Sequence, residues 1–219
     1  MARKLFIMTA RTILYLRIAL GVVAVVLTYR IYRIIMEPIE FSALKEKRYT
    51  EVTNRLEQLR EAQLVFKDEF GKYAANFDEL IVFINEAKVD IHERKDTSFM
   101  AYDETYQQEM LQETVIDRVI GQTSAKEKMI AKNPSLFSED FNPLTMRFIP
   151  FTNDQVEFEM ATGFLDRNGV RVQVFEIKAP NSAFFADIYD DYKGYIKNLR
   201  IDALIVGSLT EPTLSGNWK

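Results

Sequence analysis

The stretch Ile13-Leu-Tyr-Leu-Arg-Ile-Ala-Leu-Gly-Val-Val-Ala-Val-Val-Leu-Thr-Tyr-Arg-Ile-Tyr-Arg-Ile-Ile-Met36 decides the architecture of this chain. Between Ile18 and Thr28 no side chain can ionise, and the whole stretch reaches the roughly 20 residues that a spanning helix needs. A helix also bonds every backbone amide within the segment, as a bilayer requires. We therefore predict a transmembrane helix over residues 13–36, after a cytoplasmic tail over residues 1–12.

Charged and aromatic side chains flank the apolar centre of this stretch, where the two membrane interfaces are expected. The predicted interface residues are Arg17, Tyr29, Arg30, Tyr32 and Arg33. Tyrosine rings favour the interface, and arginine stems are long enough for the guanidinium to reach the headgroups. For Arg17 there is one alternative, a buried charge paired with a carboxylate on a membrane helix of a partner.

A cleaved signal peptide is the main competing interpretation, because Arg3 and Lys4 provide a basic start. The apolar stretch runs on into Tyr29-Arg-Ile-Tyr-Arg-Ile-Ile35 rather than into small residues at a cleavage site, which favours an uncleaved anchor. The basic residues on its two sides nearly balance, and long domains are translocated largely regardless of charge. We expect an anchor in a bacterial inner membrane with the following domain in the periplasm.

The body of the protein, residues 37–219, is acidic. Only six of the 28 lysines and arginines precede Glu37, the first of 32 acidic residues, so the body has a net charge of −10. This charge disfavours nucleic acid as a partner, because phosphate binding needs basic residues. The chain has no cysteine, which excludes disulfides, cysteine-ligated zinc, iron–sulfur clusters and thiol catalysis. The body is long enough for one domain with a core and a stalk.

Residues 41–70 contain neither proline nor glycine and carry one apolar stripe. Its members are Phe41, Leu44, Val52, Leu56, Leu59, Ala62, Phe66 and Phe70. Their spacing of mostly three or four residues predicts an amphipathic stalk helix. The stripe has two possible uses, packing on the protein's own sheet or pairing with a helix of another envelope protein or a second copy. In the second use the partner-binding residues are Val52, Leu56, Leu59 and Phe66.

Two signals follow the stalk. Gly71 can adopt the left-handed conformation that ends a helix. Asn76 and Glu79 are typical of an N-cap and its return partner, which predicts a short second helix over residues 77–87. The stalk and this helix form the predicted region 37–88.

Within residues 59–80, eight positions resemble the type IV pilin and pseudopilin superfamily. They are Ala62, Gln63, Phe66, Gly71, Tyr73, Asp78, Glu79 and Leu80. The resemblance implies a membrane helix that continues into a soluble helix. The chain has neither the Gly-Phe processing junction of that family nor an acidic residue in its apolar run, so the resemblance implies an unprocessed relative that stays in the membrane. The stretches 174–177 and 207–218 are similar to uncharacterised envelope proteins of Bacteroidota.

Strand signals accumulate in the predicted domain over residues 89–219. Residues 89–111 are polar with a near-helical spacing of larger side chains, and residues 114–120 are β-branched. Further strands are predicted over 146–151, 155–160, 170–174 and 201–206, with a hairpin turn at 166–169 and a helix over 183–199. We predict an α+β fold, in which the long helix packs on a mostly antiparallel sheet of about four strands.

No catalytic, cofactor-binding or metal-binding residue is assigned. His92, the only histidine, lies in a charged stretch without a nucleophile elbow, so we expect it to be an exposed loop histidine. The carboxylate sets are Glu139/Asp140, Glu157/Glu159 and Asp187/Asp190/Asp191, and surface charge is the simpler interpretation of each. Tyr189, Tyr192 and Tyr195 are either a recognition surface or the packed side of a helix. Trp218 either plugs the edge of its own domain or binds a partner.

These patterns favour a non-catalytic, single-pass scaffold of a pilus- or secretion-like trans-envelope complex, without cofactor, nucleic acid or small-molecule substrate. The alternative is a membrane-tethered sensor, which predicts an apolar pocket for a ligand or lipid between the sheet and the helix. A tethered hydrolase that uses the carboxylates near Glu157 or Asp187 is the third possibility.

Overall fold

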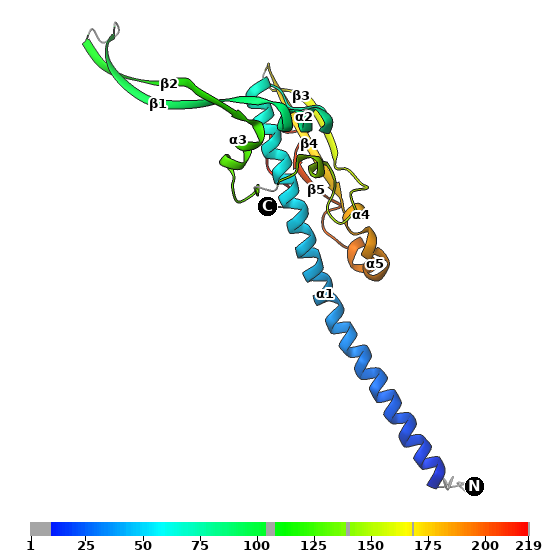
Figure 1. Ribbon diagram of the computed structural model, residues 1–219. Coiled ribbons are helices and arrows are strands. Elements are labelled where there is room, and N and C mark those ends of the chain that lie inside the picture. The colour runs from blue at the N-terminus through cyan, green and yellow to red at the C-terminus, as the bar shows by residue number, and fades with distance from the viewer. Residues whose placement is uncertain (1–9, 104–107, 139–140, 168, 219) are drawn as a thin grey trace.

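The structure is a computed structural model that describes residues 10–103, 108–138, 141–167 and 169–218. It is an α+β protein, as predicted, in which one long helix carries all the other elements near its C-terminal end (Figure 1). Two separate antiparallel β-structures are present, a two-stranded ribbon and a three-stranded sheet.

Helix α1 runs without a break over Ala10–Phe70. The predicted membrane segment and the predicted stalk are therefore one rod, about 90 Å long at 1.5 Å per residue. Pro38 lies inside the helix, where it lacks the N–H that the preceding turn needs. The Ser42 hydroxyl donates to the Pro38 carbonyl over 2.8 Å.

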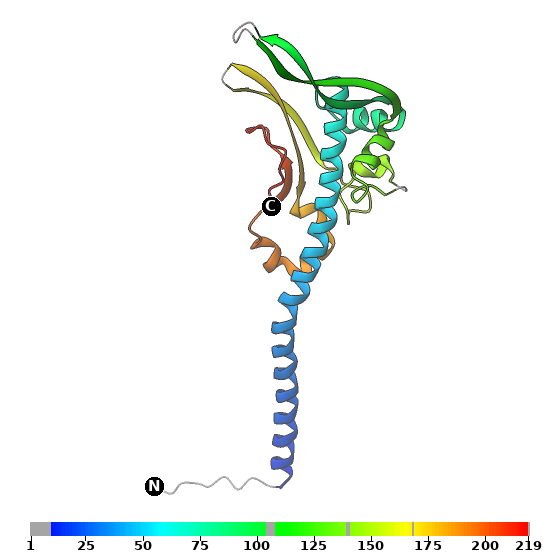
Figure 2. The ribbon, with the colours of Figure 1, turned by 90° about the vertical axis from the view of Figure 1, so that its left-hand side faces the viewer.

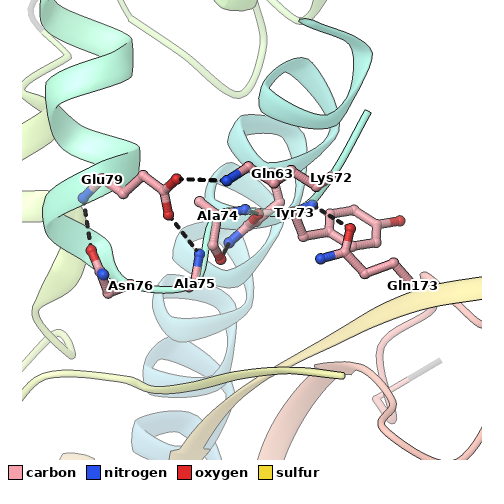
Figure 3. A network of polar contacts seen from close by, with 8 residues as sticks. All are labelled: Gln63, Lys72, Tyr73, Ala74, Ala75, Asn76, Glu79 and Gln173. Atoms are coloured by element: carbon pink, nitrogen blue, oxygen red, sulfur yellow. Dashed lines mark hydrogen bonds and ion pairs between the residues drawn. The ribbon is translucent and has the colours of Figure 1, made fainter. Parts of the chain in front are cut away.

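The turn after α1 is closed by Gln63, whose side chain is fully buried. Its amide donates to the Ala74 carbonyl (3.1 Å) and accepts from the Ala74 N–H (2.9 Å), as Figure 3 shows. Gly71 has φ +70°, the left-handed value expected at this helix end. Within the same turn, the Tyr73 N–H donates to the Gln173 side chain over 2.7 Å. One buried amide thus sets the direction in which the chain leaves α1.

Helix α2, Phe77–Glu86, starts as predicted, with Asn76 accepting from the Glu79 N–H. The return bond differs from the prediction, because the Glu79 carboxylate accepts from the Ala75 N–H instead of the Asn76 N–H. The Asn76 bond satisfies a donor that the first turn of a helix leaves unpaired. The Ala75 bond ties the residue before the N-cap to that turn.

The three-stranded sheet has the order β3-β4-β5, with β3 Glu159–Arg167, β4 Val170–Pro180 and β5 Ala203–Gly207. The predicted β3–β4 hairpin is confirmed, with Arg167 paired to Val170 across the turn. The predicted strand at 146–151 is wrong. Residues Pro143–Arg147 form a 3-10 helix, η1, and a tight turn follows in which Phe151, Asn153 and Asp154 have positive φ. That turn delays the start of β3 to Glu159.

Residues 88–103 and 108–124 form the two strands of a long ribbon rather than helical segments. Strand β1, Lys88–Asp103, pairs antiparallel with β2, Gln108–Ser124, with a register shift at Ile91/His92. The expectation of near-helical spacing before residue 111 is therefore wrong, whereas the predicted strand at 114–120 is part of β2. Helix α3, Ala125–Lys132, follows with a Ser124–Glu127 capping box. Figures 1 and 2 show the ribbon projecting sideways from the far end of α1.

The predicted helix at 183–199 is broken into three pieces. They are α4 Asn181–Phe184, the 3-10 helix η2 Ala186–Ile188, and α5 Tyr189–Lys197. Phe184 and Phe185 are adjacent and both fully buried. Successive residues of a regular helix point about 100° apart, so the backbone leaves the helical conformation at Phe185.

One cluster of buried residues contains side chains from α1, α2, β4, β5 and the segments between them. Rings pair at its centre, with Tyr73 and Phe175 at 4.7 Å and Phe66 and Phe83 at 5.0 Å between centroids. The lower part of α1 joins the same cluster through Phe41, which stacks on Tyr195 at 5.3 Å. The core therefore includes the C-terminal half of α1.

Candidate functional site

The N-terminal part of α1 is exposed throughout, and its helix is long and apolar enough to cross a membrane. The segment has a mean hydropathy of 2.0 and buries none of its surface within the protein. All five predicted interface residues lie on it with exposed side chains. Such a continuous apolar surface is unusual for a protein that meets only water. The described part of the chain thus contains one candidate membrane-spanning helix.

The apolar stripe of the stalk belongs to the protein's own core. Val52, Leu56 and Leu59 are fully buried and Phe66 is 2% exposed. These four residues were the predicted partner-binding residues, and that assignment is corrected. The same chain already covers their side chains, so no surface remains there for a partner helix. Phe70, the last member of the stripe, is 53% exposed.

The Trp218 side chain packs against its own domain. Its indole is partly buried against the core cluster. The neighbouring Asn217 bonds to both Ala203 and Ile205 of β5, with distances of 2.8 to 3.0 Å. The C-terminal segment therefore covers the outer edge of β5. Trp218 therefore packs on its own domain, and because its indole stays partly exposed, its partner-binding role remains a prediction.

Two carboxylates of the predicted sets, Glu157 and Glu159, pair with separate basic residues. Glu157 pairs with Arg147 at 2.8 Å, and Glu159 pairs with Lys178 at 3.3 Å. Glu139 and Asp140 lie outside the described residues. No group of three or more metal-ligating side chains occurs in the part of the chain that the structure describes.

His92 lies on strand β1 of the exposed ribbon, where its ring nitrogen contacts the Asp117 carboxylate at 2.9 Å. The sequence interpretation placed it in a loop, so its element is corrected while its exposure is confirmed.

The Asp187 carboxylate forms a salt bridge with Arg48. Its two oxygens accept from the Arg48 guanidinium at 2.6 and 2.7 Å, and these hydrogen bonds lower the pKa of the Asp187 carboxyl. Arg48 is almost buried, also donates to the Phe184 carbonyl, and lies 4.8 Å from the Phe151 ring. The Arg48–Asp187 pair joins α1 to η2. Tyr192 and Tyr195 likewise pack on Phe41 of α1, so they form the packed side of a helix.

An open apolar pocket of about 600 Å³ lies at the end of α1 that is far from the apolar span. We call it the distal pocket. It is lined by Phe66, Phe70, Lys72, Asp78, Glu79, Val82, Phe83, Glu86 and Ala87. Its floor is a cluster of three rings, with Phe70 at 4.7 Å from Phe66 and 5.5 Å from Phe83. Val82 is 53% exposed at its wall. The volume lies within the range of small-molecule sites.

The rim of the distal pocket is acidic. It carries Asp78, Glu79 and Glu86 against a single cation, Lys72, whose ammonium pairs with Glu79 at 3.5 Å. Asp78 is bonded to Arg147 at 2.9 Å and is still 79% exposed. Sequence reasoning missed this pocket, although Phe70 marked the end of the stripe. The missing signal was that α2 turns back beside α1, which depends on the buried Gln63.

The β1–β2 ribbon is the second surface that sequence reasoning missed. Among its described residues, the exposed large apolar side chains are Ile91, Phe99, Met100, Tyr102, Leu111, Val115, Ile116, Val119 and Ile120. A two-stranded ribbon alone is marginally stable in water. A row of exposed apolar side chains on such a ribbon is typical of a binding element.

Comparison of this chain with family models, with curated proteins and with solved structures finds no match.

Proposed function

We propose that this protein is a non-catalytic, single-pass membrane protein that acts as a scaffold in a trans-envelope assembly of the pilus or secretion type. Residues 13–36 cross a bacterial inner membrane in this proposal, and the body lies in the periplasm. The net charge of −10 on the body argues against a nucleic-acid partner. We propose that its partners are other envelope proteins.

The observation that carries the proposal is the continuity of α1. One helix of 61 residues includes both the apolar span and a large part of the core of the body. Because no flexible linker separates the two, the body is held at a defined height. From Met36 to Phe70 the helix rises about 50 Å. A rigid spacer of this kind suits a component that must present a surface at one level above a membrane.

The spacing of the predicted interface residues along the helix is compatible with this placement in the membrane. Arg17 and Arg30 are separated by about 20 Å along the helix, which is shorter than the roughly 30 Å of a hydrocarbon core. Both guanidinium groups reach the headgroups by extending their stems in opposite directions. Tyr29 and Tyr32 lie where the aromatic belt is expected.

Membrane anchoring is tested by placing charges in the middle of the span. A Val23→Arg/Val25→Arg variant carries two arginines where each costs about 2.5–3.5 kcal/mol in an inserted helix. We expect the full-length wild-type protein to stay in the membrane pellet after alkaline carbonate extraction, and the variant to appear in the supernatant or in aggregates. Ile35→Arg, at the interface, is the matched control and should stay in the pellet. Wild-type protein released by carbonate would contradict the anchor.

A reporter fused after Lys219, active only in the periplasm, tests the orientation. Purification of the full chain in mild detergent then tests the scaffold role. A lone monomer under several detergents and salt concentrations would count against it.

A second function, ligand or lipid sensing, is favoured by the distal pocket. An apolar ligand would lie on Phe70 and Val82, which are both about half exposed. We expect a fluorescent fatty acid to bind wild-type protein in detergent-free nanodiscs, and Val82→Lys to weaken that binding about tenfold, because the ammonium fills the wall of the pocket. Val156→Lys, at a similarly exposed valine elsewhere, is the control. Equal binding by all three proteins would exclude the pocket as a ligand site.

A further inference from the structure

The two halves of the β1–β2 ribbon differ in charge. We define the distal ribbon as residues 96–103 and 108–115, which pair with each other from Asp96/Val115 to Asp103/Gln108. Its sequence contains Asp96, Asp103, Glu109 and Glu113 and has no lysine, arginine or histidine. The half nearer the core contains both signs and pairs them across the strands, as Arg118 does with Glu93 at 3.3 Å. By sequence, therefore, the distal ribbon carries acidic residues and no basic ones, unlike the half nearer the core.

The distal ribbon also exposes large apolar side chains on both of its faces. Met100 and Leu111 are directly opposite each other in the register and are 60% and 61% exposed. Phe99 is 47% exposed and, as a neighbour of Met100 along the strand, points to the other face. Tyr102 is 62% exposed on the face of Met100. The described side chains of the distal ribbon are outside the core cluster.

We propose that the distal ribbon is a docking element for a protein partner whose binding groove is apolar and lined by lysine or arginine. This inference rests on the proposed scaffold function and names the surface that performs it. The apolar side chains enter the groove, and the acidic residues meet its basic rim. The outer edges of β1 and β2 are free of further strands among the described residues, so a strand of the partner can add to the ribbon by main-chain hydrogen bonds.

A second copy of this chain fits the distal ribbon less well. Two distal ribbons that pair side by side bring like charges together, which destabilises a strand pair. The other exposed apolar site, the distal pocket, has Asp78, Glu79 and Glu86 on its rim, so it repels the acidic ribbon of a neighbour. Charge complementarity therefore points to a basic partner of a different kind.

A lipid surface is also a poor occupant. Figure 1 shows the ribbon at the opposite end of α1 from the apolar span, so the anchoring membrane does not contact it. Anionic headgroups attract lysine and arginine, and they repel a segment that carries only acids.

The test uses photocrosslinking of the full-length protein in cells of the source organism. Phe99 is replaced by p-benzoylphenylalanine in one strain, and Phe164, which is 58% exposed on β3, is replaced in the control strain. We expect a crosslinked protein from position 99 only, and mass spectrometry should map the crosslink to a segment with apolar residues and neighbouring lysines or arginines. A crosslink to a second copy, to lipid or to an acidic segment overturns the proposal. A yield at position 99 equal to that at position 164 also overturns it.

Charge is tested in the same strain with Asp96→Lys, which we expect to lower the crosslink yield about tenfold, since charged pairs at a close interface contribute more than 1.4 kcal/mol. Glu211→Lys, an exposed position on another segment, changes the net charge equally and should leave the yield unchanged. Equal yields in the two variants would overturn the electrostatic part. If no partner is crosslinked at position 99 while detergent pull-down still recovers partners, the scaffold function stands and another surface binds the partners. If both fail, the scaffold proposal falls as well.

Discussion

Leu59→Ala is expected to lower the free energy of unfolding of the body by about 3–5 kcal/mol. Leu59 is fully buried in the core cluster, so the substitution removes buried methylene groups and leaves a cavity. A domain of this size has about 5–15 kcal/mol of stability in total. Urea unfolding of the full chain in detergent, followed by circular dichroism, measures the loss.

The matched control is Val82→Ala on α2, whose side chain is 53% exposed. A surface substitution of this kind changes stability by about 0.5 kcal/mol or less. If Leu59→Ala were as mild as Val82→Ala and instead reduced the recovery of partners, the stripe would be a partner surface after all. The pair of variants therefore separates the two uses that the sequence left open for the stalk.

Gly207→Ala is expected to destabilise the body by more than about 3 kcal/mol, or to prevent its folding. Gly207 ends β5 with φ +76°, and a Cβ at this position lies 2.3 Å from the Phe175 carbonyl oxygen on the neighbouring strand. The backbone conformation alone costs an alanine about 1–2 kcal/mol. The clash is with main-chain atoms of the central strand, which cannot move without breaking the sheet. The midpoint of thermal unfolding measures the effect.

Substitutions at two other glycines separate the cost of the backbone conformation from the cost of the steric clash. Gly71 has a similar φ of +70° but has no atom within 4 Å of its Cβ position, so Gly71→Ala should cost only the conformational part. Gly194 lies in α5 with open space around it, and Gly194→Ala should be neutral or stabilising by up to about 1 kcal/mol. If Gly207→Ala were no worse than Gly71→Ala, the close approach of β5 and β4 at this point would be wrong.

Elements with a strong local pattern were predicted well. The helix to Phe70, its end at Gly71 and the N-cap at Asn76 each depend on residues within one or two turns. The β3–β4 hairpin was found for the same reason, because Asp166 and Gly169 form the turn, with the Gly169 N–H bonded to the Asp166 side chain at 3.1 Å.

Elements that depend on distant partners were predicted poorly. The strand β1 has a polar, mixed sequence, and it is a strand because β2 supplies its hydrogen-bond partners, which lie up to 36 residues away at Lys88/Ser124. The three pieces between Asn181 and Lys197 replace one predicted helix because Phe184 and Phe185 must both enter the core. The local periodicity of a sequence predicts neither the pairing of β1 with β2 nor the burial of both phenylalanines.

The candidate sites divide in the same way. The exposed apolar span was visible in the sequence, since a run of apolar residues needs no tertiary partner to be recognised. The distal pocket was not, because its walls come from the end of α1 and from α2, which the Gln63–Ala74 bonds and the Phe66–Phe83 ring contact bring together. The apolar residues of the ribbon were each visible, yet their exposure followed only from the position of the ribbon outside the core.

By itself, the sequence indicated that residues 13–36 form a helix apolar enough for a bilayer, that this helix continues as an amphipathic rod, and that an acidic α+β body follows. These properties come from composition and from periodicity over a few turns. Only the tertiary structure decided which apolar surfaces are buried inside the body and which remain exposed. Burial is a property of pairs of segments, and the stripe on α1 and the distal ribbon differ in whether another part of the same chain covers them.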